Sequence, residues 1–284
     1  MPPRDNPTAR QSRLGAELRK LRERAGKPAR EAGALLGVDQ AKISNIESGR
    51  IGVSEERIRR LAVYYSCADT ALIDALCAMS REHRGQFWWD EYRGILAPAF
   101  LDIAELEHHA VRLRSMQTLS LPGLLQTEDY ARALFKGGIP PLPGEEIEAR
   151  VEHRMRRRAV LERDDPPPYE AVIHEAALRM RFGGRKVARA QLEHVLEMSE
   201  WPAVTVRVLP FSNEQFIEVT QPLLYAVGVV PQLDTVQKDS PSGSHHLDAD
   251  AELQKHRALL DVAESVSLDV GQSRQLIADI AREL

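Results

Sequence analysis

The chain has 284 residues, of which 43% are hydrophobic, and a formal net charge of −4. This length suits two domains or one large one, and the composition is ample for packed cores. No apolar run approaches the roughly 18 residues of a transmembrane helix, and the polar residues 1–13 exclude a secretory signal. We therefore expect a cytoplasmic protein without membrane contact.

The charge is unevenly distributed along the chain. Residues 1–70 hold 14 Lys and Arg against 9 Asp and Glu, a net charge of +5, and the remaining 214 residues carry −9. A basic module on an acidic body is typical of a protein that meets phosphate with one end only. Because the excess is modest, one copy would bind nucleic acid weakly and in a salt-sensitive way. Two linked copies bind better, so we expect a homodimer.

The stretch 28–50 predicts two short helices around a tight turn. Gly37 suits the positive φ that ends the first helix, and Asp39 is placed to cap the second. Ile43 and Ile46 face inward from the second helix. The outer, N-terminal part of that helix then carries Gln40, Ala41, Lys42, Ser44 and Asn45. This is the layout of a helix-turn-helix, whose second helix presents side chains to base edges in the major groove, although any small helical bundle can contain such a pair.

The flanking helices favour the DNA-binding interpretation. Upstream, 14–26 predicts an amphipathic helix, and downstream, 53–65 predicts another with Ser54 as N-cap. The chain contains the motifs Leu18-Arg-Lys-Leu-Arg22, Leu36-Gly-Val38, Ile43-Ser-Asn-Ile-Glu-Ser-Gly-Arg50 and Leu61-Ala62. With this spacing, residues 12–70 resemble the Xre/Cro/phage-repressor helix-turn-helix family, which implies an all-α, lambda-repressor-like domain. The resemblance further implies a structural ion pair between Arg22 and Glu47.

The side chains of the second helix divide into two expected roles. For base reading we expect Gln40, Ala41, Lys42, Ser44 and Asn45, since Gln and Asn pair with adenine and Lys with guanine. For phosphate binding we expect Arg10, Arg13, Lys27, Arg30 and Arg50, which position the protein without specifying sequence. The family's usual phosphate-binding Gln at the start of the first helix of the pair is missing here, and we expect Arg30 to replace it.

A second resemblance covers most of residues 88–280. It rests on the pattern Pro122-Gly-Leu-Leu-Gln-Thr-Glu-Asp-Tyr-Ala131 together with Trp89, Arg154–Arg158, His174–Arg179 and Val206–Phe211. These motifs resemble an uncharacterised C-terminal domain that follows Xre-type modules in actinobacterial, Streptomyces-like regulators. The resemblance implies a sequence-specific transcriptional regulator with double-stranded DNA as its partner. For some members it implies an antitoxin-like protein that sequesters a small co-encoded partner, and a small-molecule effector is a third possibility.

The elements expected after residue 88 mix helices and strands. The expected helices cover 101–113, 128–134, 148–163, 175–181, 187–199, 248–263 and 271–283, and the expected strands cover 169–174, 205–209, 222–230 and 233–237. We expect a mobile loop over 241–246. On the basic helix 148–163, the interleaved Glu148, Glu152 and Glu162 favour a solvated or salt-bridged face, and a second DNA contact is the alternative. The fold class is therefore mixed, with an all-α N-terminal domain and an α+β (α/β) C-terminal domain.

The sequence also predicts where the domains begin and end and whether the chain carries catalytic groups. We expect a disordered arm over 1–11, the helix-turn-helix domain over 12–70, a helical connector or fifth helix over 71–87, and the C-terminal domain over 88–284. His174-Glu175 at a strand end is the best candidate for acid-base work. No nucleophile elbow, phosphate-binding glycine loop or zinc spacing accompanies it, so we expect no enzyme, no metal and no cofactor.

Overall fold

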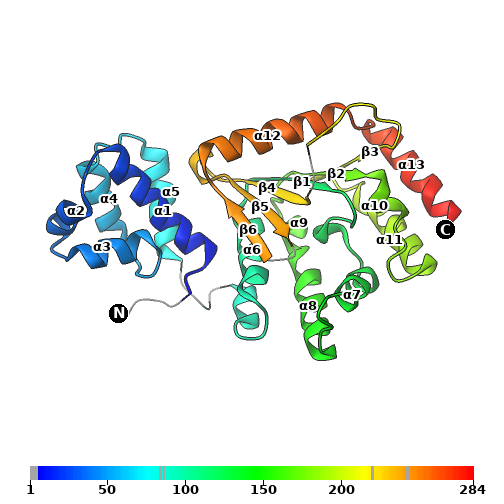
Figure 1. Ribbon diagram of the computed structural model, residues 1–284, viewed down its shortest axis with the longest axis horizontal. Coiled ribbons are helices and arrows are strands. Elements are labelled where there is room, and N and C mark those ends of the chain that lie inside the picture. Colours follow the sequence, from blue (N-terminus) through cyan, green and yellow to red (C-terminus); the bar gives the residue numbers. More distant parts are fainter. Residues whose placement is uncertain (1–5, 83–84, 86, 219–220, 241–242) are drawn as a thin grey trace. The chain divides into compact units, whose positions relative to one another are not determined.

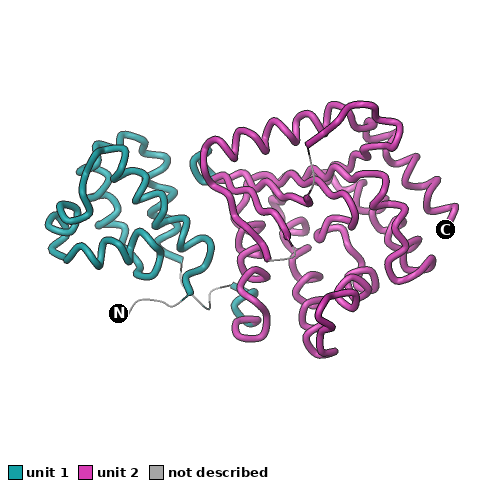
Figure 2. Tube along the Cα trace, viewed as in Figure 1, with its two compact units in different colours: residues 1–91, 229–233 teal, residues 92–228, 234–284 magenta. Residues whose placement is uncertain are grey.

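The computed structural model describes residues 6–82, 85, 87–218, 221–240 and 243–284. The chain divides into two compact units, coloured separately in Figure 2. The first unit comprises residues 1–91 together with 229–233, and the second comprises residues 92–228 and 234–284. Among the described residues, no helix combines the length and the apolar composition needed to span a membrane.

The first unit is helical. Its helices are α1 (Ala9–Arg24), α2 (Ala29–Leu36), α3 (Gln40–Glu47), α4 (Glu55–Tyr64) and α5 (Thr70–Arg81). The 3₁₀ helix η1 (Trp88–Tyr92) follows, and its last residue is assigned to the second unit. Gly37 ends α2 with φ of 65°, and the Asp39 carboxylate accepts a hydrogen bond of 2.7 Å from the Lys42 amide at the start of α3. Both turn features predicted from the sequence are therefore confirmed.

One apolar core joins all five of these α-helices. Its buried members include Leu18, Leu36, Ile43, Ile46, Ile58, Leu61, Leu72 and Leu76. Leu72 and Leu76 belong to α5, so this helix is a fifth helix of the unit and not only a connector. Burial of these side chains is the main source of stability for helices as short as α2 and α3, which are too short to be stable alone.

Two glycines allow the helices to approach closely. A Cβ atom at Gly15 on α1 would lie 2.5 Å from the carbonyl oxygens of Ile46 and Glu47 on α3. A Cβ atom at Gly33 on α2 would lie 2.7 Å from the Val38 carbonyl oxygen in the turn. Both distances are far below normal contact, so these positions set how tightly α1 and the turn pack around α3.

The second unit is a mixed sheet covered by helices (Figure 1). Its strands are β1 (Arg112–Gln117), β2 (Tyr169–His174), β3 (Val204–Leu209), β4 (Leu223–Val227), β5 (Thr235–Ser240) and β6 (Gly243–Leu247). In the described part of the chain their order is β3-β2-β1-β4-β5-β6. β3, β2 and β1 are parallel, and β1, β4, β5 and β6 are joined by antiparallel pairs.

The helices of the second unit lie on both faces of this sheet. They are α6 (Pro98–His109), η2 (Gly123–Leu125), α7 (Glu128–Lys136), α8 (Gly144–Arg157), α9 (Ala159–Glu162), α10 (Glu175–Arg179), α11 (Arg185–Met198), α12 (Asp250–Ser265) and α13 (Val270–Glu283). The short helix η3 (Pro231–Leu233) belongs to the first unit. On one face, α12 packs Leu253 and Leu260 against Val172 and Val236. On the other face, α11 and α13 cover a larger core that includes Ile173 and Val206.

The described structure differs from the sequence-based expectations at several places, one of which is the strand expected over 222–230, because β4 ends at Val227. α1 begins at Ala9, where the sequence predicts a disordered arm through residue 11, because Thr8 forms a capping box with Gln11. Residues 112–117 form β1, although the sequence predicts a helix through residue 113, because β2 and β4 pair with this segment. Residues 243–247 form β6 and not a loop, because they pair with β5, and residues 241–242 of the expected loop lie outside the described residues. The basic helix expected over 148–163 begins at residue 144 and divides into α8 and α9.

Candidate functional site

The N-terminal half of α3 projects polar side chains away from the core. Gln40, Ala41 and Ser44 are exposed, and Lys42 and Asn45 are half-buried. Ile43 and Ile46, which alternate with them, are only 1% and 2% exposed. Within the described part of the chain, the side chains of Gln40, Lys42 and Asn45 make no hydrogen bond or ion pair. Their donors and acceptors are therefore free to bind another molecule.

The ion pair between Arg22 and Glu47 joins α1 to the C-terminal end of α3. Arg22 Nε and Nη2 donate to the two Glu47 carboxylate oxygens at 2.6 and 2.9 Å. Arg22 Nη1 also donates to the Lys27 carbonyl oxygen at 2.9 Å, which ties the connection between α1 and α2 to the same group. The Glu47 hydrogen bonds raise the pKa of Arg22 above its ordinary value. This bidentate geometry fixes the orientation of α3 relative to α1.

The cations expected to bind phosphate fall into two groups. Arg30 and Arg50 are exposed and have no ion-pair partner in the described chain, while the Lys27 ammonium lies 5.0 Å above the Tyr64 ring. Arg10 instead donates to Glu82 at 2.6 and 2.7 Å. Arg13 lies 3.3 Å from Glu17 and also donates to the Gln232 carbonyl oxygen, within the same unit. Both of these arginines on α1 therefore have intramolecular partners.

The pair His174-Glu175 serves the local structure. Glu175 accepts hydrogen bonds of 2.8 Å from Arg179 and from the backbone amide of Phe211. His174 Nδ1 accepts a 3.1 Å hydrogen bond from the Ala176 amide and so caps α10. The groups considered for acid-base chemistry thus stabilise the turn between β2 and α10. Among the described residues, no cluster of three or more His, Cys, Asp or Glu side chains is arranged to hold a metal ion.

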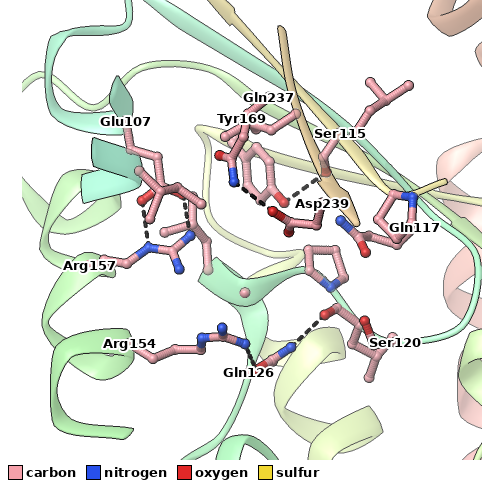
Figure 3. A pocket seen from close by; sticks show the side chains of 18 residues that line it. Glu107, Ser115, Gln117, Ser120, Gln126, Arg154, Arg157, Tyr169, Gln237 and Asp239 are labelled. Atoms are coloured by element: carbon pink, nitrogen blue, oxygen red, sulfur yellow. Dashed lines mark hydrogen bonds and ion pairs between the residues drawn. The ribbon is translucent and has the colours of Figure 1, made fainter. Parts of the chain in front are cut away.

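The second unit contains a polar cavity of about 100 Å³, shown in Figure 3. It is lined by side chains from α6, β1, η2, α8, β2, β4 and β5, among them Glu107, Ser115, Gln126, Arg154, Arg157, Tyr169, Gln237 and Asp239. Arg154 and Arg157 lie on α8, for which the sequence predicts a solvated or salt-bridged face. The solvated face is wrong for these two arginines, because Gln126 and Glu107 bind them at the cavity. The sequence spacing indicates the inward position of Arg154, because residue 154 lies on the same face of the helix as the buried Ile147 and Val151, at positions i+7, i and i+4.

The first unit has the fold and the exposed second helix of a DNA-binding helix-turn-helix domain. A family model described as a helix-turn-helix domain matches residues 13–76. A second family model, described as a domain of unknown function (DUF5753), matches residues 100–279. Because this match covers more than half of the chain, the protein belongs to the DUF5753 family. No curated protein and no solved structure matches the chain significantly.

Proposed function

We propose that the protein is a sequence-specific transcriptional regulator of the Xre type that reads DNA with α3. The observation that carries this proposal is the N-terminal half of α3, which bears unbonded polar side chains on a helix anchored by buried Ile43 and Ile46. The Arg22–Glu47 pair holds this helix from behind, so its outer side chains have a fixed register. A helix presented in this way fits the major groove of double-stranded DNA.

In this proposal the reading and anchoring roles are separate. Gln40 and Asn45 recognise adenine and Lys42 recognises guanine, with Ala41 and Ser44 completing the base-reading surface. Arg30 and Arg50 bind phosphate, because both are exposed and lack an intramolecular partner among the described residues. Lys27 is a weaker candidate, since its ammonium already lies over the Tyr64 ring. Arg10 and Arg13 contribute only if DNA displaces their present partners.

The active species in this proposal is a homodimer. A single α3 reads only a few base pairs, and the net charge of +5 over residues 1–70 supplies modest attraction to phosphate. Two copies spaced by about one helical turn of DNA would combine two weak contacts into one strong site. The operator is then expected to be an inverted repeat.

The test is selection of binding sequences from a random double-stranded DNA library, followed by fluorescence anisotropy on the selected site. We expect an inverted repeat, bound at least about a thousandfold more tightly than random DNA. Gln40→Ala and Asn45→Ala are each expected to cost about 1–3 kcal/mol on the selected site and to relax the preference at one base position. Equal losses on random DNA would refute their roles in base reading.

The phosphate contacts are tested by salt dependence. Arg30→Ala and Arg50→Ala are expected to weaken binding to all sequences alike, and each should reduce the slope of log K against log salt by about 1. Arg189→Ala, which removes an exposed arginine of α11 that pairs with Glu193, is the matched control and should leave the slope unchanged. A slope that is the same in all three variants would rule out phosphate contacts by Arg30 and Arg50.

A further inference from the structure

The cavity of the second unit has the size of a small-molecule site. Its volume is about 100 Å³, while a single water needs roughly 10–15 Å³ and a benzene molecule occupies an engineered cavity of about 150 Å³. The residues that line it come from segments between Ile103 and Asp239, all within the second unit. The cavity can therefore hold a molecule of several non-hydrogen atoms.

Arg154 brings to this cavity a positive charge that has no ion-pair partner among the described residues. Its Nη1 atom donates to Gln126 Oε1 at 2.7 Å, and its guanidinium lies 4.6 Å from the centre of the Phe135 ring. Its Nε atom is buried without a hydrogen-bond partner, and no carboxylate of the described residues lies within ion-pair distance. Burial and the neighbouring charge of Arg157 lower the pKa of Arg154, while the carboxylates of Glu107 and Asp239 raise it by smaller amounts. The side chain is half-buried, and a cation partly withdrawn from water is costly unless an anion accompanies it.

The neighbouring carboxylate is already used by another arginine. Glu107 accepts hydrogen bonds from Arg157 Nε and Nη2 at 2.8 and 2.5 Å, and both side chains are almost fully buried. The Arg157 guanidinium lies against Gly123, where a Cβ atom would be only 3.3 Å from Nη2. The Pro122-Gly123 turn thus lies close against Arg157. Because Glu107 is paired with Arg157, Arg154 has no ion pair of its own.

A different part of the cavity offers hydrogen-bond acceptors. Gln237 on β5 is buried, and its Oε1 atom has no hydrogen-bond partner. The Nε2 atom of the same side chain donates to Asp239 Oδ1 at 3.0 Å and to the Ser244 hydroxyl at 2.9 Å, which fixes the amide orientation. Figure 3 shows Gln237 and Asp239 near each other, on a different element from Arg154. A ligand atom that carries a hydrogen would satisfy the Gln237 oxygen.

We propose that this cavity binds a small molecule that carries two polar groups. An oxyanion, either a carboxylate or a phosphate, binds Arg154, and a hydrogen-bond donor, either a hydroxyl or an ammonium, binds Gln237 and Asp239. The guanidinium supplies charge-assisted hydrogen bonds to the oxyanion, and Gln126 holds the guanidinium in place. The site belongs to the second unit alone, and it stands independently of how the first unit reads DNA.

The experiment measures thermal unfolding and calorimetric binding of the full chain with defined probes. These are inorganic phosphate, glycerol 3-phosphate, acetate, lactate and glycine, each compared with chloride at the same ionic strength. We expect saturable one-to-one binding of the phosphate probes or of the carboxylate probes. Glycerol 3-phosphate should then bind more tightly than phosphate, or lactate and glycine more tightly than acetate. Either class supports the site and identifies the anion. Absence of binding by all five probes would overturn the proposal.

Variants assign the binding to this cavity. Arg154→Gln should weaken binding about tenfold or more. It should leave the unfolding temperature of the free protein unchanged or higher, because it removes a half-buried charge that has no ion pair. Arg154→Lys, which keeps the charge, should retain part of the affinity. The matched control Arg189→Gln removes an exposed arginine of the same unit and should bind like the natural chain. Equal affinity in Arg154→Gln and Arg189→Gln would overturn the assignment.

The donor side of the ligand is tested separately. Gln237→Met should remove the advantage of glycerol 3-phosphate over phosphate, or of lactate and glycine over acetate, and leave the bare anion bound. A preference that persists in this variant would overturn the proposed role of Gln237. Arg154→Gln and Gln237→Met both change a side chain that lines the cavity. Circular dichroism of each variant verifies that its fold is intact.

Discussion

The candidate site of each unit keeps unbonded polar groups in a different place. On α3 of the first unit the side chains of Gln40, Lys42 and Asn45 lie on the outer side of the helix. At the cavity of the second unit, Arg154 Nε and Gln237 Oε1 are buried atoms. An open helix face can meet a polymer of any length, whereas a cavity of about 100 Å³ admits only a small molecule. Accessibility, more than charge, therefore distinguishes the two kinds of partner that we propose.

Both units also contain an Arg–Glu pair that ties two helices together. In the first unit Arg22 and Glu47 have side chains that are 12% and 9% exposed. In the second unit Arg157 and Glu107 are 5% and 3% exposed. The free-energy cost of leaving one charge unpaired grows as water is excluded from it. Removing one partner is therefore expected to destabilise the protein more at the pair of the second unit than at the pair of the first.

The largest effect is expected from Glu107→Gln, which keeps the shape of the side chain and removes its charge. Arg157 would then be buried without a counterion, and we expect a loss of about 3–5 kcal/mol in the free energy of unfolding. Urea denaturation measures the loss, and hydrogen exchange of α6 and α8 locates it. Glu193→Gln, which breaks an exposed pair with Arg189, is the control. A similar small change in both variants would show that burial does not set the energy of the pair.

A somewhat smaller effect is expected from Arg22→Met in the first unit. Glu47 would lose both hydrogen bonds, but it keeps more contact with water, so we expect a loss of about 2–3 kcal/mol. Hydrogen exchange of α1 and α3 should increase in the same variant. The double variant Arg22→Met, Glu47→Leu replaces the pair by apolar side chains and should recover at least half of the loss. Equal stability of the single and double variants would contradict an unpaired Glu47 as the cause.

The second unit is also expected to be the more sensitive of the two to acid. Burial and the nearby charges of Arg157, Arg154 and Arg156 lower the pKa of His153 from 6.5 to about 3. Between these values the unfolded chain binds a proton that the native chain does not, so stability falls as the pH falls. At pH 5 this amounts to about 2 kcal/mol.

The contribution of His153 is measured by comparing unfolding at pH 7 and pH 5 in the natural chain and in His153→Phe. The ring of His153 lies 5.0 Å from that of Tyr92 and 5.8 Å from that of Phe100, so an aromatic replacement fits the site. We expect the variant to lose about 2 kcal/mol less on acidification than the natural chain. The same loss in both chains would contradict a depressed pKa of His153.

The smallest effect is expected at the turn of the first unit. Asp39→Ala removes the N-cap of α3, whose carboxylate accepts from the Lys42 amide, and should cost about 1 kcal/mol. Asp39→Asn keeps a capping oxygen and should cost only a few tenths of that amount. Chemical denaturation of the two variants gives the difference. An equal loss in both would mean that charge, and not the hydrogen bond, stabilises the helix end.

The sequence by itself determined the helical unit, because its signals are local. Gly37, Asp39 and Ser54 mark helix ends, and apolar residues at three- and four-residue spacing mark the buried faces. Those signals need no knowledge of the rest of the chain. The class of fold followed from the same reasoning, since the sequence predicts strands mixed with helices after residue 88 and the structure has them.

Only the tertiary structure decided which residues form β1 and which side chains line the cavity. β1 has Arg114 and Ser115 at its centre, so no alternation of apolar residues marks it, and it is stable because β2 and β4 pair with it on both sides. The cavity joins side chains as distant in sequence as Glu107 and Gln237. A buried polar side chain leaves little periodic signature, because its position is set by a partner that lies far along the chain.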